Sequence, residues 1–472
     1  MRLTQKIAYN TIIQTVGKFI SVFFGVIALG IMTRYLGAER FGQYTTVVAF
    51  LQFFAILADM GLMLITVQMI SRPNVDEEKI LNNIFTLRFF ASIIFFSIAP
   101  IVSFFFPYPT IVKIAIVIFT VSFFLLSLIQ VLTGLFQKKL KIIKVTIADI
   151  LGKSTIILFI ALAAYFDLGL LGIISAGVVG AIFNFSYLFY STRKIIKIHW
   201  AFDFDIWKET LRKSWPIALS IAFNLVYLKA DTIILSLYHS QSDVGLYGAS
   251  FRFLEILIML PTMFMGLILP LLSNYWNGKN FIEFKKIFKT AFDVMIITAI
   301  PLAIGTLFLA KPIIILVAGN EFAPAAPILK VIIFASAIVF IGTLYGHTIV
   351  AIEKQKKMIW AYAITAAISL TIYLIVIPKY SYYGAAWATV FAESLIALIC
   401  AWMVIKTTKI FPNFLIILKV LIASGIMAAV LYFIKEQNLF ISLITSIAVY
   451  FFALYILKAL PKNLIREIIK IK

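Results

Sequence analysis

Ionisable side chains within long apolar runs are the part of this sequence that could do chemistry. A charged group in hydrocarbon is costly, so each one should face protein, water or a partner. Cations at such positions could bind an anionic group, and carboxylates could carry protons or sodium ions. The candidate anion-binding cations are Lys18, Arg88, Lys153, Lys229 and Arg252. The candidate ion-coupling carboxylates are Asp59, Asp231, Glu255 and Glu393.

Spacing along a helix indicates which of these charges can neutralise each other. Asp149 and Lys153 are four residues apart, and Arg252 and Glu255 are three apart. Residues at these spacings share a helix face, so both pairs are expected to form. Arg252 would still have guanidinium donors left for a phosphate.

Other ionisable residues lack a local partner. Lys229 and Asp231 are two residues apart and therefore point to different faces. Lys18 is expected about 12 Å into the first helix at 1.5 Å per residue. Asp59 and Glu393 are expected near mid-membrane with no opposite charge within one turn. These two are the best candidates for coupling transport to an ion, because an isolated buried carboxylate should titrate closer to physiological pH.

Membrane helices must position these residues. Of the 472 residues, 63% are hydrophobic and 13% are charged, and the mean hydropathy is +1.05. A soluble domain is typically about half apolar and a quarter charged, so the composition excludes a water-soluble enzyme. Fourteen apolar runs reach the length of roughly 20 residues that a spanning helix needs. They are approximately 10–33, 43–66, 84–106, 110–133, 145–165, 170–191, 216–238, 245–270, 290–310, 325–350, 358–377, 383–405, 415–434 and 438–457.

The excess of basic residues indicates orientation rather than nucleic-acid binding. The formal net charge is +21, and 28 of the 41 Lys and Arg fall at the two ends and in every second loop, against six in the opposite loops. Cytoplasmic loops of membrane proteins carry such an excess. The sequence therefore predicts that both termini are cytoplasmic. Arg88 would lie within about a turn of that face, where a long side chain reaches water easily.

Other kinds of site are not expected. Residues 152–155, Gly-Lys-Ser-Thr, resemble the end of a phosphate-binding loop, but Ile147 stands where that motif requires its first glycine. Cys400 is the only cysteine, so an intrachain disulfide and a Cys-rich metal site are excluded. We expect no catalytic residue, no metal site and no cofactor.

Three cytoplasmic stretches are expected to be helices lying in the membrane interface. Residues 196–213, 280–292 and 461–472 mix apolar residues with Lys and Arg, which is typical of helices on an anionic leaflet. In the second stretch, Asn280 is a candidate helix cap with Glu283 three residues later.

The two halves of the sequence resemble each other. At a constant offset of 203, four positions in the first half match four in the second: Tyr35 with Tyr238, Gly42 with Gly245, Tyr44 with Tyr247, and Phe50 with Phe253. Each repeat holds six helices, an even number, so both enter the membrane in the same orientation and are related by an axis along the membrane normal.

The repeat predicts the domain organisation of an all-α membrane protein. An N-terminal six-helix bundle would occupy residues 1–191, and a cytoplasmic interfacial linker 192–215. A C-terminal six-helix bundle, related to the first by a pseudo-two-fold axis, would occupy 216–405. Two additional transmembrane helices and a basic cytoplasmic tail would complete the chain at 406–472.

Two regions of the sequence resemble a known family. The segments TRYLGAERFGQY and ADMGLMLITVQMISR, and later ADTIILSLYHSQSDVGLYGASFRF, are similar to bacterial polysaccharide flippases of the multidrug/oligosaccharidyl-lipid/polysaccharide exporter superfamily. The resemblance implies a flippase that moves a polyprenyl-pyrophosphate-linked oligosaccharide across the cytoplasmic membrane by alternating access. Its product would serve O-antigen, capsule or exopolysaccharide synthesis.

The resemblance also implies partners. Besides the lipid-linked oligosaccharide and membrane lipids, these are H⁺ or Na⁺, a glycan polymerase and glycosyltransferases, but no nucleic acid. Three alternatives stay open: a cation-coupled multidrug exporter of the same superfamily, a peptidoglycan-precursor flippase, and a membrane-embedded glycan polymerase or ligase. Such enzymes commonly need a sizeable outward loop for acid and base groups, whereas the outward loops here are short, so we expect no enzyme.

Overall fold

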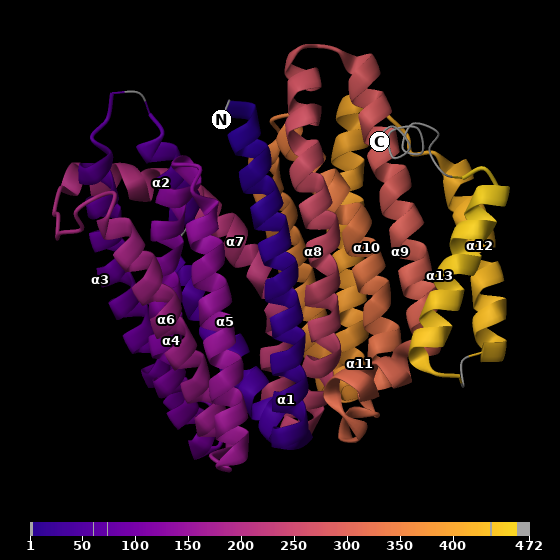
Figure 1. Ribbon diagram of the computed structural model, residues 1–472, viewed down its shortest axis with the longest axis horizontal. Helices are drawn as coiled ribbons and strands as arrows, with labels where there is room; N and C mark the ends of the chain where they lie inside the picture. The colour runs from indigo at the N-terminus through magenta and orange to yellow at the C-terminus, as the bar shows by residue number, and fades with distance from the viewer. Residues whose placement is uncertain (1–2, 60, 73, 435–436, 460–472) are drawn as a thin grey trace. The chain divides into compact units, whose positions relative to one another are not determined.

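The chain is built from α-helices. The computed structural model describes residues 3–59, 61–72, 74–434 and 437–459, and over these ranges it contains no strand. The helices of the first half are α1 Leu3–Asp59, α2 Leu62–Ile70, α3 Glu77–Phe104, α4 Thr110–Lys138, α5 Ile142–Tyr165, α6 Gly169–Arg193 and α7 Phe204–Tyr238. Those of the second half are α8 Gln241–Asn277, α9 Phe281–Ala318, α10 Ala325–Ala351, α11 Met358–Thr408, α12 Phe414–Ile434 and α13 Leu439–Ile456 (Figure 1).

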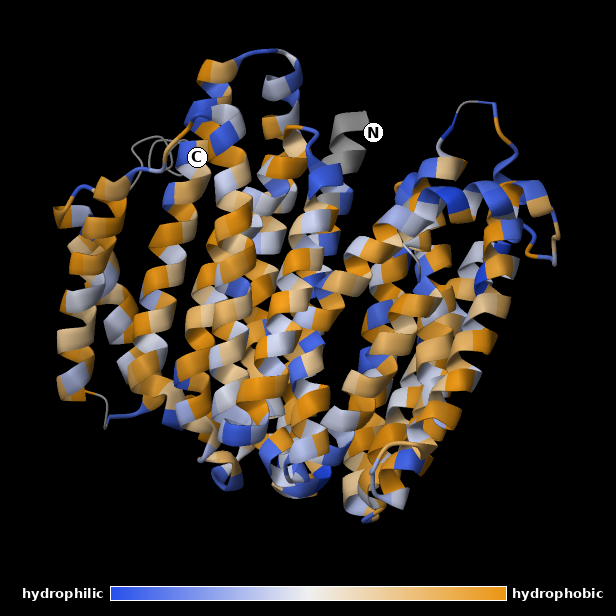
Figure 2. Cartoon of the chain, turned by 180° about the vertical axis from the view of Figure 1, so that it is seen from behind, coloured by the Kyte–Doolittle hydropathy of each residue, from blue (hydrophilic) through white to orange (hydrophobic). Residues whose placement is uncertain are grey.

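Twelve helices in the described part of the chain are long and apolar enough to cross a membrane. They correspond to the fourteen expected runs, because α1 and α11 each continue through one non-helical residue, Gly37 and Ser381 respectively. The run expected at 43–66 is shorter than predicted, since α1 ends at Asp59 and the separate short helix α2 begins at Leu62. Figure 2 shows hydrophobic residues along the middle of the helices and hydrophilic ones gathered at helix ends and loops. The all-α membrane class is thus confirmed, while the count of fourteen spans and the orientation stay predictions.

Of the interfacial helix expected at 196–213, residues 204–213 form the first turns of α7, but residues 196–203 are not helical. Two buried asparagines of α3 hold residues 196–203 in place. Asn82 Nδ2 donates to Lys197 O at 2.9 Å, and the Asp203 N–H donates to Asn83 Oδ1 at 2.7 Å. The prediction was wrong here because side-chain amides distant in sequence satisfy backbone groups that a helix would otherwise pair.

The second expected interfacial stretch is helical but is not a separate helix. Residues 281–292 are the first turns of α9, and Asn280 caps them as predicted, with its Oδ1 accepting from the Glu283 N–H at 3.2 Å. Phe284 and Phe288 are fully buried, so this phenylalanine stripe packs mainly against protein. The third stretch, 461–472, lies outside the described residues.

The predicted orientation can be tested by cysteine labelling. In a Cys400→Ser background, single cysteines at Ser240 and Ser381 are expected to react with a membrane-impermeant maleimide added outside intact cells. A cysteine at Lys356 should react only after permeabilisation. External labelling at position 356 would contradict both the orientation and the parallel repeat.

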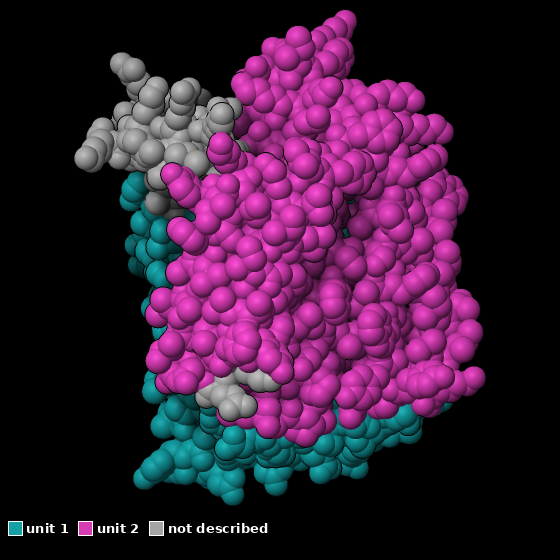
Figure 3. Space-filling model, turned by 90° about the vertical axis from the view of Figure 1, so that its right-hand side faces the viewer, with its two compact units in different colours: residues 1–245, 317–321 teal, residues 246–316, 322–472 magenta. Residues whose placement is uncertain are grey.

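The chain divides into two compact units, coloured separately in Figure 3. Unit 1 comprises residues 1–245 and 317–321, and unit 2 comprises residues 246–316 and 322–472. This division groups α7 with the first six helices by compactness. The bundle boundaries predicted from the repeat concern internal symmetry and stay a prediction.

Unit 1 is held together by a bundle in which α6 packs against both α4 and α5, and α3 packs against α4. Its core is aliphatic and aromatic, with contributions such as Met69 from α2, Phe85 from α3, Phe136 from α4 and Leu188 from α6. α1 packs against α5 and α7. These contacts fix the depth and rotation of the ionisable residues on α1, α3 and α5.

The interruption in α1 is stabilised by a distant segment of the same unit. Gly37 has φ +68°, a backbone conformation that favours glycine, and the helix restarts at Ala38. There the Glu321 carboxylate accepts the Ala38 N–H at 2.7 Å, while Arg34 donates to Val317 O at 2.7 Å. A carboxylate at a new helix N-terminus satisfies an orphan N–H and complements the helix dipole.

Two glycines matched by the sequence repeat contact each other directly. A Cβ built on Gly42 would lie 1.6 Å from Gln241 O and 2.9 Å from Gly245 N. A Cβ on Gly245 would lie 2.0 Å from Ala38 O. The restarted part of α1 and the start of α8 therefore cross backbone to backbone, a separation that only glycine permits at both positions.

Unit 2 uses hydroxyl groups to join its helices. Tyr247 of α8 is fully buried and hydrogen-bonds Thr389 of α11 at 3.0 Å. Ser250 donates to Ala325 O at the start of α10 at 2.9 Å, and Tyr450 of α13 donates to Ile297 O of α9 at 2.7 Å. α10 packs along α11, and α12 along α13. Such bonds are favoured in lipid, where unpaired polar groups are costly.

Candidate functional site

A group of polar side chains lies where α1 packs against α5; we call Lys18, Ser21, Asp149 and Lys153 the α1–α5 polar cluster. Lys153 Nζ lies 3.8 Å from the Asp149 carboxylate and donates to Ser21 O at 3.1 Å. The Ser21 hydroxyl donates to Asp149 Oδ2. The helices are close here, since a Cβ on Gly17 would lie 2.2 Å from the Thr146 side chain. The pairing of Asp149 with Lys153 is confirmed.

The α1–α5 polar cluster combines exposure with an excess of positive charge. The Lys153 and Asp149 side chains are 36% and 42% exposed. Lys18, one turn before Ser21 on α1, is exposed and has no ion pair within the described residues. Lys18 included, the cluster carries two ammonium groups and one carboxylate. Lys153 lies about 17 Å from the start of α5, too deep for exposure to lipid to be cheap, which favours a water-filled path on this surface.

The sequence suggested that Arg88 reaches water. In the structure its side chain is instead buried within unit 1 and is only 1% exposed. Its Nη2 lies 2.9 Å from the Asp59 carboxylate and 3.0 Å from Gln130 Oε1. Its Nη1 donates to Ala58 O at 2.6 Å and its Nε to Ser127 O at 3.3 Å. We call these five residues the Arg88 network.

The Arg88 network overturns the expectation that Asp59 is isolated. Asp59 ends α1, where the negative end of the helix dipole disfavours a carboxylate. Arg88 offsets the negative charge of the carboxylate by pairing with it. Arg88 also offsets the negative end of the helix by donating to the carbonyl of Ala58. The partner could not be seen in local sequence because it lies on another helix.

The remaining α7 candidates are enclosed to different degrees. Asp231 is fully buried, and its Oδ1 accepts from the backbone N–H and the hydroxyl of Thr232 at 2.5 Å and 3.1 Å. Lys229 is half-buried on the same helix.

Unit 2 holds three of the candidates, two on α8 and one on α11. Arg252 Nη1 lies 2.6 Å from Glu255 Oε2, which confirms the predicted pair, and both side chains are partly exposed. Glu393 is 6% exposed.

The structure thus brings together some of the predicted residues within one unit. Lys18 and Lys153 join the α1–α5 polar cluster, and Arg88 joins Asp59. Sequence reasoning missed Ser21 and Gln130, which bind to these charges. Their only signal is a polar side chain within an apolar run, which is too common to identify a site.

An all-helical chain with ionisable residues clustered at membrane depth is typical of a multi-pass membrane transporter. A family model described as "Polysaccharide biosynthesis protein" matches residues 31–327. This is more than half of the chain, which therefore belongs to that family and resides in the cell membrane.

Curated relatives are similar over part of their length. The chain is 25% identical over 225 residues to the capsular polysaccharide biosynthesis protein CapF of Staphylococcus aureus, covering 47% of this chain and 57% of CapF. It is 23% identical over 215 residues to the probable flippase AglR of Haloferax volcanii, covering 45% of each chain. The chain thus spans about half the length of the curated relatives it matches.

Solved structures share the fold. A lipid II flippase MurJ in an inward closed conformation aligns with a TM-score of 0.77 at 18% identity, covering 94% of this chain and 98% of MurJ. An inward-facing multidrug resistance MATE family transporter of the MOP superfamily aligns with a TM-score of 0.70 at 13% identity, covering 82% and 95%. Both likenesses concern the fold, which is that of the superfamily expected from the sequence.

Proposed function

We propose that this protein is a flippase that moves a lipid-linked oligosaccharide, with a polyprenyl-pyrophosphate anchor, across the cell membrane for polysaccharide biosynthesis. Membership of the polysaccharide biosynthesis protein family is the observation that carries the proposal. The names of CapF and AglR, a capsular polysaccharide protein and a probable flippase, point the same way.

The α1–α5 polar cluster supplies chemistry that fits such a substrate. A pyrophosphate brings at least two negative charges, and Lys18 and Lys153 offer two ammonium groups against the one carboxylate of Asp149. Lys18 and Lys153 are exposed enough to be reached, whereas Arg88 is not. We therefore propose Lys18 and Lys153 as the first contacts of the pyrophosphate, with Lys229 and Arg252 as the next cations to test.

A cation-coupled multidrug exporter is the second candidate, because the MATE transporter shares the fold. A drug cation would be repelled by a cluster with net positive charge, which favours the first candidate. A peptidoglycan-precursor flippase differs from the first candidate only in the glycan.

Reconstituted protein in liposomes can distinguish these candidates. Flipping of a fluorescent polyprenyl-pyrophosphate oligosaccharide is measured by its accessibility to an external quencher. Lys18→Gln/Lys153→Gln is expected to lower the flipping rate at least tenfold, because two charge-assisted contacts are lost. Lys286→Gln, at an exposed lysine paired with Glu283, serves as the matched control. Equal rates in both variants, or transport of a cationic dye in place of the glycolipid, would contradict the proposal.

We further propose that transport is coupled to H⁺ or Na⁺ through a buried carboxylate, with Glu393 the first to test and Asp231 and Glu255 next. Asp59 is a weaker candidate because Arg88 holds it in an ion pair. In the same liposomes, an imposed ion gradient should accelerate flipping by wild-type protein but not by Glu393→Gln. Gradient dependence retained in that variant would assign coupling to another carboxylate.

A further inference from the structure

Ser21 of α1 contacts both charged side chains of the Asp149–Lys153 pair. Its hydroxyl donates to Asp149 Oδ2, and its carbonyl oxygen accepts from Lys153 Nζ at 3.1 Å. Lys153 Nζ lies 3.8 Å from the same Asp149 Oδ2, which is beyond hydrogen-bond distance. The ammonium group and the carboxylate are therefore neighbours that each bind Ser21 more closely than they bind each other.

The packing of α1 on α5 fixes Ser21 at this place. Near the start of both helices, Asn10 Oδ1 accepts the N–H of Ile142, the first residue of α5, at 3.0 Å. Further along, Gly17 lies so near Thr146 that a Cβ would come within 2.2 Å of the threonine side chain. Ser21 follows one turn later and is 4% exposed. The positions of its carbonyl oxygen and its Cβ are thus set by the packing of two backbones.

The Ser21 hydroxyl competes with Lys153 for one carboxylate oxygen. Asp149 and Lys153 are four residues apart on α5, a spacing at which a carboxylate and an ammonium group can meet directly. With the hydroxyl on Oδ2, the ion pair stays open at 3.8 Å. An ammonium group has more N–H donors than the bond to Ser21 O uses. Lys153 therefore keeps donors for an anion.

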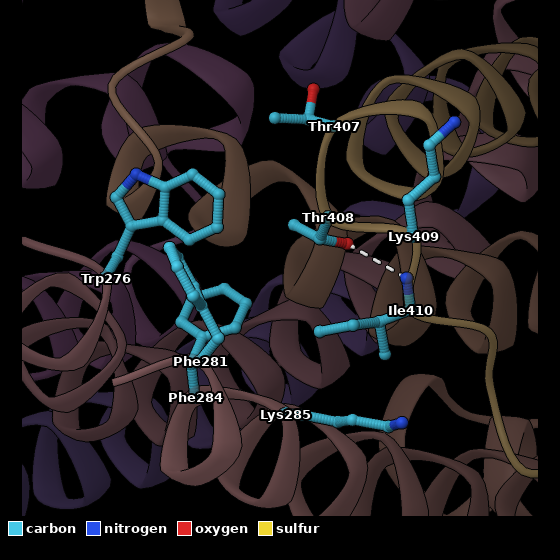
Figure 4. Close-up of a pocket in the computed structure, with 8 residues that line it drawn as sticks. All are labelled: Trp276, Phe281, Phe284, Lys285, Thr407, Thr408, Lys409 and Ile410. Atoms are coloured by element: carbon cyan, nitrogen blue, oxygen red, sulfur yellow. Dashed lines mark hydrogen bonds between the residues drawn. The ribbon is translucent and has the colours of Figure 1, made fainter. Parts of the chain in front are cut away.

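Positive side chains do not converge in this way in the pocket of unit 2 that forms where α8 ends, α9 begins and α11 ends (Figure 4). Its cavity volume is about 320 Å³, and Lys285 and Lys409 both line it. Figure 4 shows that their ammonium groups point away from each other. The two lysines therefore share a pocket without sharing a position at which both could hold one anion.

We propose that Ser21 is a positioning residue for the substrate: it holds Asp149 away from Lys153 and so keeps the ammonium group available to the pyrophosphate. This role rests on the flippase function proposed above. Without the hydroxyl, the Asp149 carboxylate would move into direct contact with Lys153 and compete with the substrate for it. Ser21 would thus set the affinity for the substrate through Asp149.

The effect can be measured as the half-saturating mole fraction of glycolipid in the liposome flipping assay. Ser21→Ala is expected to raise this value roughly fivefold, the upper range for a partly exposed ion pair that the substrate must now open. The maximal rate should stay the same, because a saturating substrate has already opened the pair. Thr155→Ala is the matched control on α5, since its hydroxyl donates to Leu151 O of the same helix at 2.9 Å, and it should change neither value.

A second background shows whether Ser21 acts through Asp149. In Asp149→Asn there is no carboxylate charge to hold away, so adding Ser21→Ala should leave the half-saturating fraction unchanged. If Ser21 only packs α1 against α5, the increase should be the same in both backgrounds, and that result would overturn the proposal. An unchanged value in Ser21→Ala alone would overturn it as well.

The availability of the Lys153 amine gives a readout that needs no substrate. Purified full-length protein is treated with a limiting amount of acetic anhydride, and acetylation of Lys153 relative to Lys286 is measured by peptide mass spectrometry. Ser21→Ala should lower this ratio roughly fivefold, because a carboxylate in direct contact shields the amine, and Ser21→Ala/Asp149→Asn should not. If the wild-type protein does not flip the glycolipid, the proposed function fails, but this ratio still tests Ser21. An unchanged ratio in Ser21→Ala would contradict its role.

Discussion

Gly42→Ala is expected to lower the free energy of unfolding by about 3 kcal/mol or more, the upper end of the cost of overpacking. The new methyl group would lie 1.6 Å from Gln241 O, a backbone atom that cannot rotate away. Gly245→Ala should have a similar effect, since its Cβ would lie 2.0 Å from Ala38 O. Thermal unfolding of detergent-solubilised protein, followed by size-exclusion chromatography, measures the change.

The matched control is Gly25→Ala in the same helix. A Cβ at Gly25 meets no atom within 4 Å, and alanine favours helix over glycine by about 1 kcal/mol. This variant should therefore be as stable as the wild type or slightly more stable. If Gly42→Ala and Gly25→Ala unfolded at the same temperature, the result would contradict the close backbone crossing of α1 and α8.

Arg88→Met is expected to destabilise the protein by about 3–5 kcal/mol, the usual cost of removing one partner of a buried ion pair. The change leaves the Asp59 carboxylate, Ala58 O and Gln130 Oε1 without the donors that now bind them. Asp59→Asn in the same chain should recover part of the loss, because the uncompensated charge is removed. The free energy of unfolding of the two single variants and the double variant forms a double-mutant cycle.

The same cycle separates two roles for Arg88. If Arg88 is structural, its substitution and that of Asp59 change the free energy of unfolding in a non-additive way. If Arg88 binds substrate instead, its substitution lowers transport and leaves the free energy of unfolding unchanged. Lys153→Gln provides the comparison, since Lys153 is 36% exposed and should change stability little. Additive effects of the Arg88 and Asp59 substitutions would contradict the structural role.

Much of the fold could be predicted from the sequence because the bilayer imposes length and polarity on every span. Apolar runs of spanning length correspond to the observed helices, and the superfamily fold was expected from short motifs. Helix ends were harder to predict. No local pattern indicated that residues 196–203 bind Asn82 and Asn83 of α3, or that α1 ends at Asp59 in contact with Arg88.

Charge pairs divide in the same way. Asp149 with Lys153 and Arg252 with Glu255 were predictable, because helical geometry alone brings residues three or four apart onto one face. The pairing of Asp59 with Arg88 was not, because it requires the end of one helix to lie beside the middle of another.

By itself, then, the sequence determined that this is an all-helical membrane protein, and it indicated which residues carry charge into the membrane. The requirement to satisfy every backbone group within lipid leaves a long apolar chain little choice but helices. Only the tertiary structure decided which charges are enclosed, as Arg88 is, and which stay accessible, as Lys18 and Lys153 are. It also decided that Lys285 and Lys409 share a pocket. These outcomes depend on contacts between helices, whose depth and rotation are fixed by packing over the whole unit rather than by local sequence.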